Sequence, residues 1–110
     1  PEHEMLISLL TAVCAKDGKG IIHAVEVLEK NTNALRAYDD FIEIVRSALL
    51  ARVKESVVAD PKSVTLGKEY PLIINSKLVL TLLENRQYLS ISDAHAWIAF
   101  ESILLALVEG

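Results

Sequence analysis

The sequence ALRAYDDFIEIVRSALLARV, residues 34–53, carries the clearest structural pattern in this chain of 110 residues. Its apolar residues recur every three or four positions, and this spacing places side chains on one face of an α-helix. Charged residues fill the other face, where Arg36 and Asp40 are spaced for weak pairing. We therefore expect a long amphipathic helix over residues 33–57. Its apolar face is formed by Leu35, Tyr38, Phe41, Ile42, Val45, Leu49 and Val53.

Four further segments repeat apolar residues with helical spacing. They cover residues 3–16, 19–30, 72–88 and 91–109. Ser90 and Asp93 have the spacing of a capping box at the start of the last segment. No segment reads as a strand with an obvious partner. The pattern predicts an all-α fold, a five-helix bundle formed as a single domain by residues 1–110.

The connection between the third and fourth helices holds two of the three prolines, Pro61 and Pro71. A proline disfavours helical backbone in the residue that precedes it, here Asp60 and Tyr70. We therefore predict a surface loop over residues 58–71.

Composition argues against several classes of protein. The formal net charge is -4 at pH 7, whereas a surface that binds nucleic acid is normally basic, so no direct nucleic-acid contact is expected. No apolar run reaches the ~20 residues that span a bilayer, so we expect no membrane contact. The single cysteine, Cys14, cannot form an internal disulfide and suits the reducing cytoplasm, where we expect the protein to act.

The stretch KDGKG, residues 16–20, raises the question of a phosphate-binding loop. Such a loop follows a buried strand and reads Gly-x-x-x-x-Gly-Lys-Ser/Thr, so that backbone amides and a lysine surround the phosphates. Here one residue separates Gly18 from Gly20, and a helix precedes the turn. The spacing predicts a hinge between two helices, with Gly18 ending the first and Lys19 near the start of the second.

The titratable residues do not form a catalytic or metal-binding pattern. His3, His23 and His95 are scattered along the chain, whereas metal sites gather ligands at helical or loop spacing. Asp39 and Asp40 are neighbours on a helix and point about 100° apart, which indicates two solvated carboxylates. We expect no enzymatic activity, no metal and no cofactor in this chain.

The last predicted helix, residues 91–109, is apolar nearly all the way round. A helix of this kind is either central in its own bundle or buried against another subunit. Trp97 and Phe100 fit both settings, because aromatic residues are enriched in cores and in interfaces.

The order of these segments resembles the third domain of the gamma/tau subunits of the bacterial DNA polymerase III clamp loader. The resemblance is carried by LISLLTAVCAKDGKGIIHAVEVLEKN (6–31), by residues 34–53 and by LTLLENRQYLSISDAHAWIAFESILLALVEG (80–110). That family shows a helix ending in a small-acidic-glycine turn, then a helix with an amphipathic leucine or valine pattern, and next a long helix with an acidic pair, an arginine and a Leu-Leu pair. The long-helix positions are occupied by Asp40, Phe41, Arg46, Leu49 and Leu50. The family opens its last helix with Pro-Arg, and this chain has Ala94-His95-Ala96 instead.

The resemblance implies a helical collar domain that follows an AAA+ ATPase module and holds the clamp loader together during DNA replication. The expected partners are other clamp-loader subunits or further copies of this chain, and ATP is expected only in the upstream module. Because the chain starts at Pro1, we expect a fragment of a longer protein. Trp97, Phe100, Leu104 and Leu107 are the predicted subunit-interface anchors. The alternative is a helical adaptor that binds a partner helix or peptide in a groove.

Overall fold

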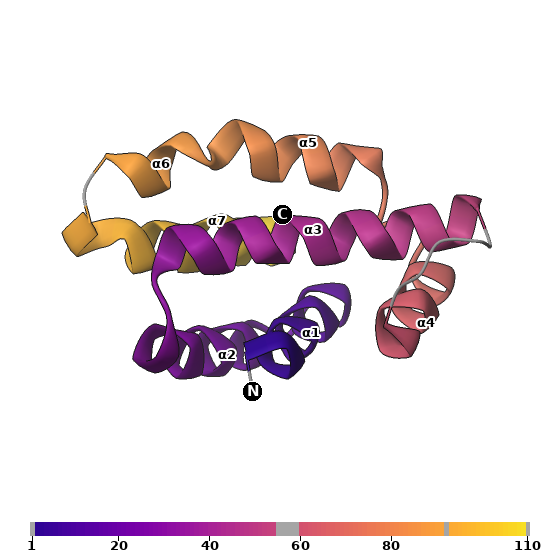
Figure 1. Ribbon diagram of the computed structural model, residues 1–110, viewed down its shortest axis with the longest axis horizontal. Helices are drawn as coiled ribbons and strands as arrows, with labels where there is room; N and C mark the ends of the chain where they lie inside the picture. The colour runs from indigo at the N-terminus through magenta and orange to yellow at the C-terminus, as the bar shows by residue number, and fades with distance from the viewer. Residues whose placement is uncertain (1, 55–59, 92, 110) are drawn as a thin grey trace.

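The computed structural model describes residues 2–54, 60–91 and 93–109, and within these ranges it is helical with no strand (Figure 1). The all-α prediction is confirmed, but the division into five helices is wrong, because one helix was missed and another is broken in two. The helices are α1 (Glu2–Cys14), α2 (Gly18–Asn31), α3 (Ala34–Val53), α4 (Pro61–Glu69), α5 (Ser76–Asn85), α6 (Gln87–Ser90) and α7 (Ala96–Glu109), with a 3₁₀ turn at Asp93–His95.

The helices lie in three layers (Figure 1). α5 and α6 form the top layer in this view, α3 and α7 the middle layer, and α1 and α2 the lower one, while α4 lies beside the carboxyl end of α3. Every other α-helix contacts α3. The stretch with the clearest pattern in the sequence is therefore the central element of the fold.

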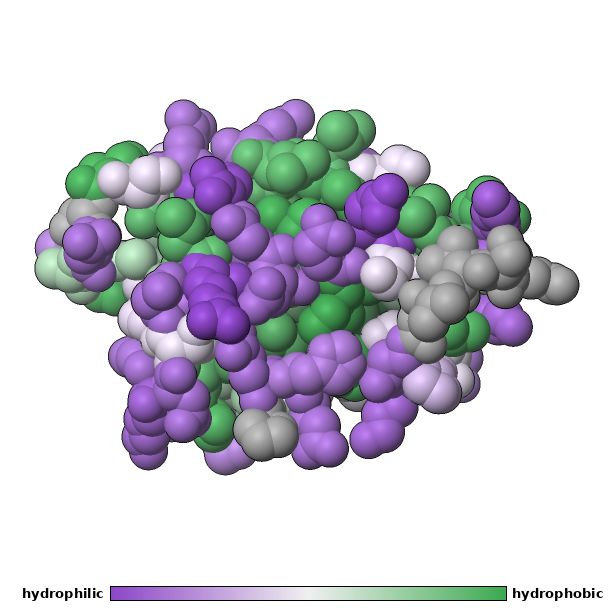
Figure 2. All heavy atoms as spheres, viewed as in Figure 1, coloured by the Kyte–Doolittle hydropathy of each residue, from purple (hydrophilic) through white to green (hydrophobic). Residues whose placement is uncertain are grey.

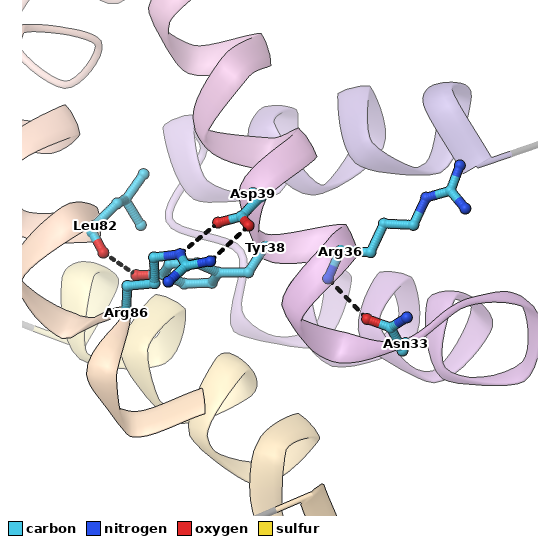
Figure 3. Close-up of polar contacts among 6 residues, drawn as sticks. All are labelled: Asn33, Arg36, Tyr38, Asp39, Leu82 and Arg86. Carbon is cyan, nitrogen blue, oxygen red and sulfur yellow. Dashed lines mark hydrogen bonds and ion pairs between the residues drawn. The ribbon is translucent and has the colours of Figure 1, made fainter. Parts of the chain in front are cut away.

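The start of α3 and its buried face follow from its sequence. The Asn33 side chain accepts a hydrogen bond from the Arg36 backbone N–H at 2.8 Å, so it caps the helix (Figure 3). Most of the predicted apolar stripe is buried, but Val53 is 73% exposed at the carboxyl end. The helix ends at Val53, and the predicted continuation through residues 55–57 lies outside the described residues.

Aromatic residues from α3 and α7 meet at the centre of the core. Tyr38, Phe41 and Phe100 have no exposed surface. The Tyr38 and Phe100 rings meet edge to face, with centroids 5.3 Å apart and an interplanar angle of 87°, a geometry that aromatic quadrupoles favour. This contact joins the middle of the chain to its last helix.

The predicted loop at residues 58–71 is wrong for most of its length, because α4 occupies Pro61–Glu69. Asp60 caps α4 by accepting a hydrogen bond from the Lys62 backbone N–H, and Pro61 occupies the first turn, where its missing N–H costs nothing. A proline disfavours helical backbone in the residue before it, here Asp60, but it is favourable as the first residue of a helix, here Pro61 of α4. Leu66 is buried in the core, which gives α4 its tertiary support.

The KDGKG stretch is a turn between two helices, as predicted, but its glycine has a different role. Lys16 adopts the left-handed conformation, with φ 55°. Asp17 caps α2 by accepting a hydrogen bond from the Gly20 backbone N–H at 3.0 Å. Gly18 therefore begins α2 and does not end α1.

Candidate protein-interaction site

Exposed apolar side chains are concentrated in the segment from the turn before α5 to the start of α7. Among the described residues, eight large hydrophobic side chains are exposed, and six of them fall between residues 72 and 98. Single exposed apolar residues are normal on soluble proteins, whereas a concentration of them indicates a contact surface. Figure 2 shows hydrophobic residues gathered over α5 at the top of the view. We call the six residues the α5–α7 face: Leu72, Leu80, Leu83, Tyr88, Ile91 and Ile98.

A groove with a volume of about 470 Å³ lies between α6 and α7 on this side. One face of α7 lines it, and this face includes the small residues Ala99, Ser102 and Ala106. The walls come from the end of α5, from α6 and from the turn before α7. The groove is lined by Asn85, Tyr88, Ile91, His95, Ile98, Ala99, Ser102, Ile103 and Ala106. We call it the α6–α7 groove.

α5 and α6, which both line the groove, are separated at Arg86. In a continuous helix the Arg86 N–H would bond to the Leu82 carbonyl. Here the Arg86 N–H bonds to the Leu83 carbonyl instead, at 3.3 Å, and the Leu82 carbonyl accepts a hydrogen bond from the Tyr38 hydroxyl (Figure 3). A buried residue of α3 thus donates to the carbonyl that the Arg86 N–H would use in a continuous helix. The prediction of one helix over 72–88 was wrong, because α5 begins only at Ser76 and ends at Asn85, and α6 follows from Gln87.

Arg86 is also fixed from α3. Its guanidinium donates two hydrogen bonds to the Asp39 carboxylate, at 2.7 and 2.9 Å (Figure 3). The hydrogen bond from Arg86 holds the pKa of the Asp39 carboxyl below its ordinary value. The sequence predicted a solvated Asp39 carboxylate, and the structure shows that it is paired with Arg86. The pair holds the start of α6, and with it the groove wall, against α3.

Tyr38→Phe is expected to lower the free energy of unfolding by about 1–2 kcal/mol, because the buried Leu82 carbonyl loses its partner. The freed carbonyl also becomes available to the Arg86 N–H, so hydrogen exchange around residues 85–88 should change. Urea unfolding and amide exchange measure the two effects. Unchanged exchange at these amides would show that Tyr38 does not define the end of α5.

The Asp39–Arg86 pair predicts a pH dependence with a definite sign. Because the folded-state pKa of Asp39 is lowered, its stabilisation is present above the unfolded pKa near 4 and is lost as the pH falls through the folded value. Asp39→Asn should be slightly less stable than the wild type at pH 7, and the difference should disappear near pH 2. Thermal melts of both proteins from pH 2 to pH 7 test this, and a constant difference would contradict it.

The predicted interface anchors divide into two groups. Phe100 and Leu104 are 0% exposed, so in this fold they belong to the core and offer no surface to a neighbour. Trp97 is half-buried and stacks on Phe100, with ring centroids 5.4 Å apart. Leu107 is half-buried and lines a second hollow beside Leu72.

Sequence reasoning missed the residues that form the exposed groove, above all Ile98 on α7. Helical spacing separates two faces of α7 but does not say which of them is buried. Ala96, Phe100 and Leu104 recur every four residues on one face and are buried, and Ile98, Ser102 and Ala106 repeat the same spacing on another face. The face with the larger side chains became core.

Chemically reactive groups do not converge in the part of the chain that the structure describes. No group of three or more His, Cys, Asp or Glu side chains is placed there to hold a metal ion. Burial raises the pKa of the Cys14 thiol to about 11, so the thiol stays protonated and unreactive at neutral pH.

Across residues 2–54, 60–91 and 93–109, no helix has the length and apolar character needed to cross a membrane. Comparisons of this chain with protein-family models, with curated proteins and with solved structures found no match.

Proposed function

We propose that this chain is an oligomerisation domain whose α5–α7 face packs against neighbouring protein subunits. The observation that carries the proposal is that three exposed apolar side chains, Tyr88, Ile91 and Ile98, line the α6–α7 groove. Exposing such side chains to water is unfavourable, at about 25 cal/mol per Å² of apolar surface. Burying these side chains against another protein removes this cost and provides the driving force for association.

The assembly that we propose is the clamp loader of a bacterial DNA polymerase III, in which this chain acts as the collar domain of a gamma/tau-type subunit. The support is the order of helical segments in the sequence, together with the all-α fold in which they are arranged. In this role the domain contributes cohesion between subunits in the cytoplasm, and ATP hydrolysis belongs to an upstream module. Stable interfaces bury about 1,600 Å² in total, and a few central residues dominate their strength. Tyr88, Ile91 and Ile98 are the proposed central residues.

Reconstitution tests this proposal. The chain is mixed with purified clamp-loader subunits of the organism that encodes it, and the mixture is separated by size with light-scattering detection. We expect a complex of defined stoichiometry that is lost with Ile98→Asp and retained with Ile22→Asp, a control on α2. Circular dichroism confirms that both variants are folded. Failure of the wild-type chain to join any clamp-loader subunit would overturn the clamp-loader assignment.

The groove itself favours a second function, that of an adaptor that binds one helix of a partner. Small residues on the floor and apolar walls are what an amphipathic helix requires. The two functions differ in what is bound, because an adaptor takes up an isolated helical peptide, whereas a collar requires a folded neighbouring domain. Titrating the chain with peptides that correspond to single helices of its partner separates them.

A further inference from the structure

We propose that the hollow beside Leu72 binds an acidic peptide segment of a partner protein through one or two leucine-type side chains. The hollow is formed by the ends of α1 and α7, by the turn before α5 and by the first turns of α5, and we call it the Leu72 hollow. Its volume is about 300 Å³, and its lining includes Leu72, Ile73, Leu78, Leu107, Lys16 and Lys77. It shares no lining residue with the α6–α7 groove, so the inference goes beyond the proposed function and does not depend on it.

The charged side chains that line the Leu72 hollow are both basic, although the whole chain has a net charge of -4. Lys16 and Lys77 are exposed, and within the described ranges neither ammonium group is paired with a carboxylate. Asp17 follows Lys16 directly, but its carboxylate accepts a hydrogen bond from the Gly20 N–H. The two lysines therefore leave a positive potential at the hollow, which complements carboxylates on a ligand.

The backbone of Lys16 gives an independent reason to regard this lysine as functional. Its φ is 55°, in the left-handed region that glycine enters freely and that a residue with a Cβ atom enters at a cost. The Lys16 N–H bonds to the Val13 carbonyl and the Asp17 N–H bonds to the Ala12 carbonyl, a pattern that usually ends a helix with glycine at this position. Persistent strain of this kind is concentrated at functional sites, and here it places an ammonium group beside the hollow.

The apolar rim of the Leu72 hollow stands on a firmly held turn. Leu72 is the most exposed of the large hydrophobic residues that the structure describes, at 91%. The Asn75 side chain donates to the Leu72 carbonyl at 3.0 Å, and the Arg52 guanidinium on α3 donates to the Ile74 carbonyl at 2.7 Å. Because this backbone is already ordered, contact between Leu72 and a ligand costs little backbone entropy.

The shape and lining of the Leu72 hollow favour a peptide over other acidic partners. Sites for single-stranded nucleic acid combine basic residues with aromatic rings on which bases stack, and among the described residues no aromatic side chain lines this hollow. An anionic membrane presents a broad surface, whereas this feature is concave. A leucine side chain suits its apolar part, and neighbouring Asp or Glu side chains would meet the two lysines.

Fluorescence anisotropy with labelled peptides tests the inference. The probes are peptides in which leucine pairs of different spacing are set among Asp and Glu residues. Two matched sets replace the acidic residues by Asn and Gln, or the leucines by Ala. We expect binding only where leucines and acidic residues occur together, and several-fold weaker binding when salt rises from about 50 to about 500 mM. Failure of every acidic leucine peptide, or equal binding of the Asn and Gln set, would overturn the proposal.

Variants of the chain locate the binding site. Leu72→Ala should weaken binding by about tenfold, because it removes the apolar contact, and Lys77→Gln should weaken it by about threefold. Leu80→Ala and Lys19→Gln are the matched controls, since both residues are exposed and neither lines the hollow. Equal losses from the controls would show that the peptides bind elsewhere and would overturn the proposal.

Lys16→Gly separates binding from folding. The change removes the ammonium group and relieves the left-handed strain, so we expect about threefold weaker peptide binding with a melting temperature at or above that of the wild type. If Lys16 served only the end of α1, peptide binding would stay unchanged, and this result would contradict its place in the site.

Other occupants of the hollow give different results. Binding of a single-stranded oligonucleotide or of anionic phospholipid vesicles that depends on Lys77 and not on Leu72 would overturn the peptide as ligand. Self-association of the chain that Leu72→Ala abolishes, seen by sedimentation without peptide, would replace it by a second copy. Ile98→Asp, in the α6–α7 groove, should leave peptide binding unchanged, so failure of this inference and failure of the proposed function are separate outcomes.

Discussion

Phe100→Ala is expected to lower the free energy of unfolding by roughly 3–5 kcal/mol, because it removes a fully buried ring from the centre of the core. The cavity would lie between Tyr38, which meets Phe100 edge to face, and Trp97, which stacks on it. Such a loss is a large fraction of the stability of a domain of this size. Urea unfolding followed by circular dichroism measures it.

The control for this prediction is Ile98→Ala, two residues earlier on the same helix. Ile98 is 62% exposed, so its truncation in the monomer should change stability by only about 0.5 kcal/mol. The two variants separate the core face of α7 from its groove face. Comparable losses from both would show that α7 does not have the orientation described.

Gly67→Ala is expected to destabilise the protein by about 1–3 kcal/mol and to loosen α4. Gly67 is buried where α4 crosses α3, and a Cβ atom added there would lie 2.4 Å from the backbone oxygen of Ala48. Backbone cannot move aside as a side chain does, so α4 must shift away. Because the Gly67 carbonyl also accepts a hydrogen bond from the Arg52 guanidinium on α3, the shift would weaken that bond as well.

Gly18→Ala serves as the matched control, because the nearest atom to an added Cβ is the Leu105 Cδ2 at 3.7 Å, an ordinary contact distance. Gly18 begins α2, where alanine is the better helix former, so we expect an unchanged or slightly raised melting temperature. Thermal melts compare the two variants. A melting temperature for Gly67→Ala at or above that of the wild type would be incompatible with the close approach of α4 and α3.

Much of the fold could be predicted because local pattern and tertiary packing agree. The apolar stripe of α3 is long, and helices on both sides of KDGKG have their own apolar faces. α4 could not be predicted from apolar spacing, since its buried positions include the small residues Ser63 and Gly67. Its sequence signal was the pair Asp60-Pro61, a cap followed by a proline in the first turn.

The break between α5 and α6 depends on a contact that is distant in sequence. Tyr38 and Leu82 are separated by 44 residues, and residues 76–90 contain no proline or glycine to mark the end of a helix. The groove wall was therefore not predictable from local sequence. The proposed interface residues on α7 were also beyond prediction from local sequence. Helical spacing defines the faces of α7, but only tertiary packing decides which face is buried.

Position-resolved hydroxyl-radical labelling tests most directly whether the α5–α7 face is a protein interface. The chain is labelled as a dilute monomer and again in its assembly, with other copies or with clamp-loader subunits. We predict that assembly reduces labelling of Tyr88, Ile91 and Ile98 several-fold and leaves Ile22 on α2 unchanged. Equal labelling of the three groove residues in both states, with protection appearing on the α1–α2 side, would contradict the account.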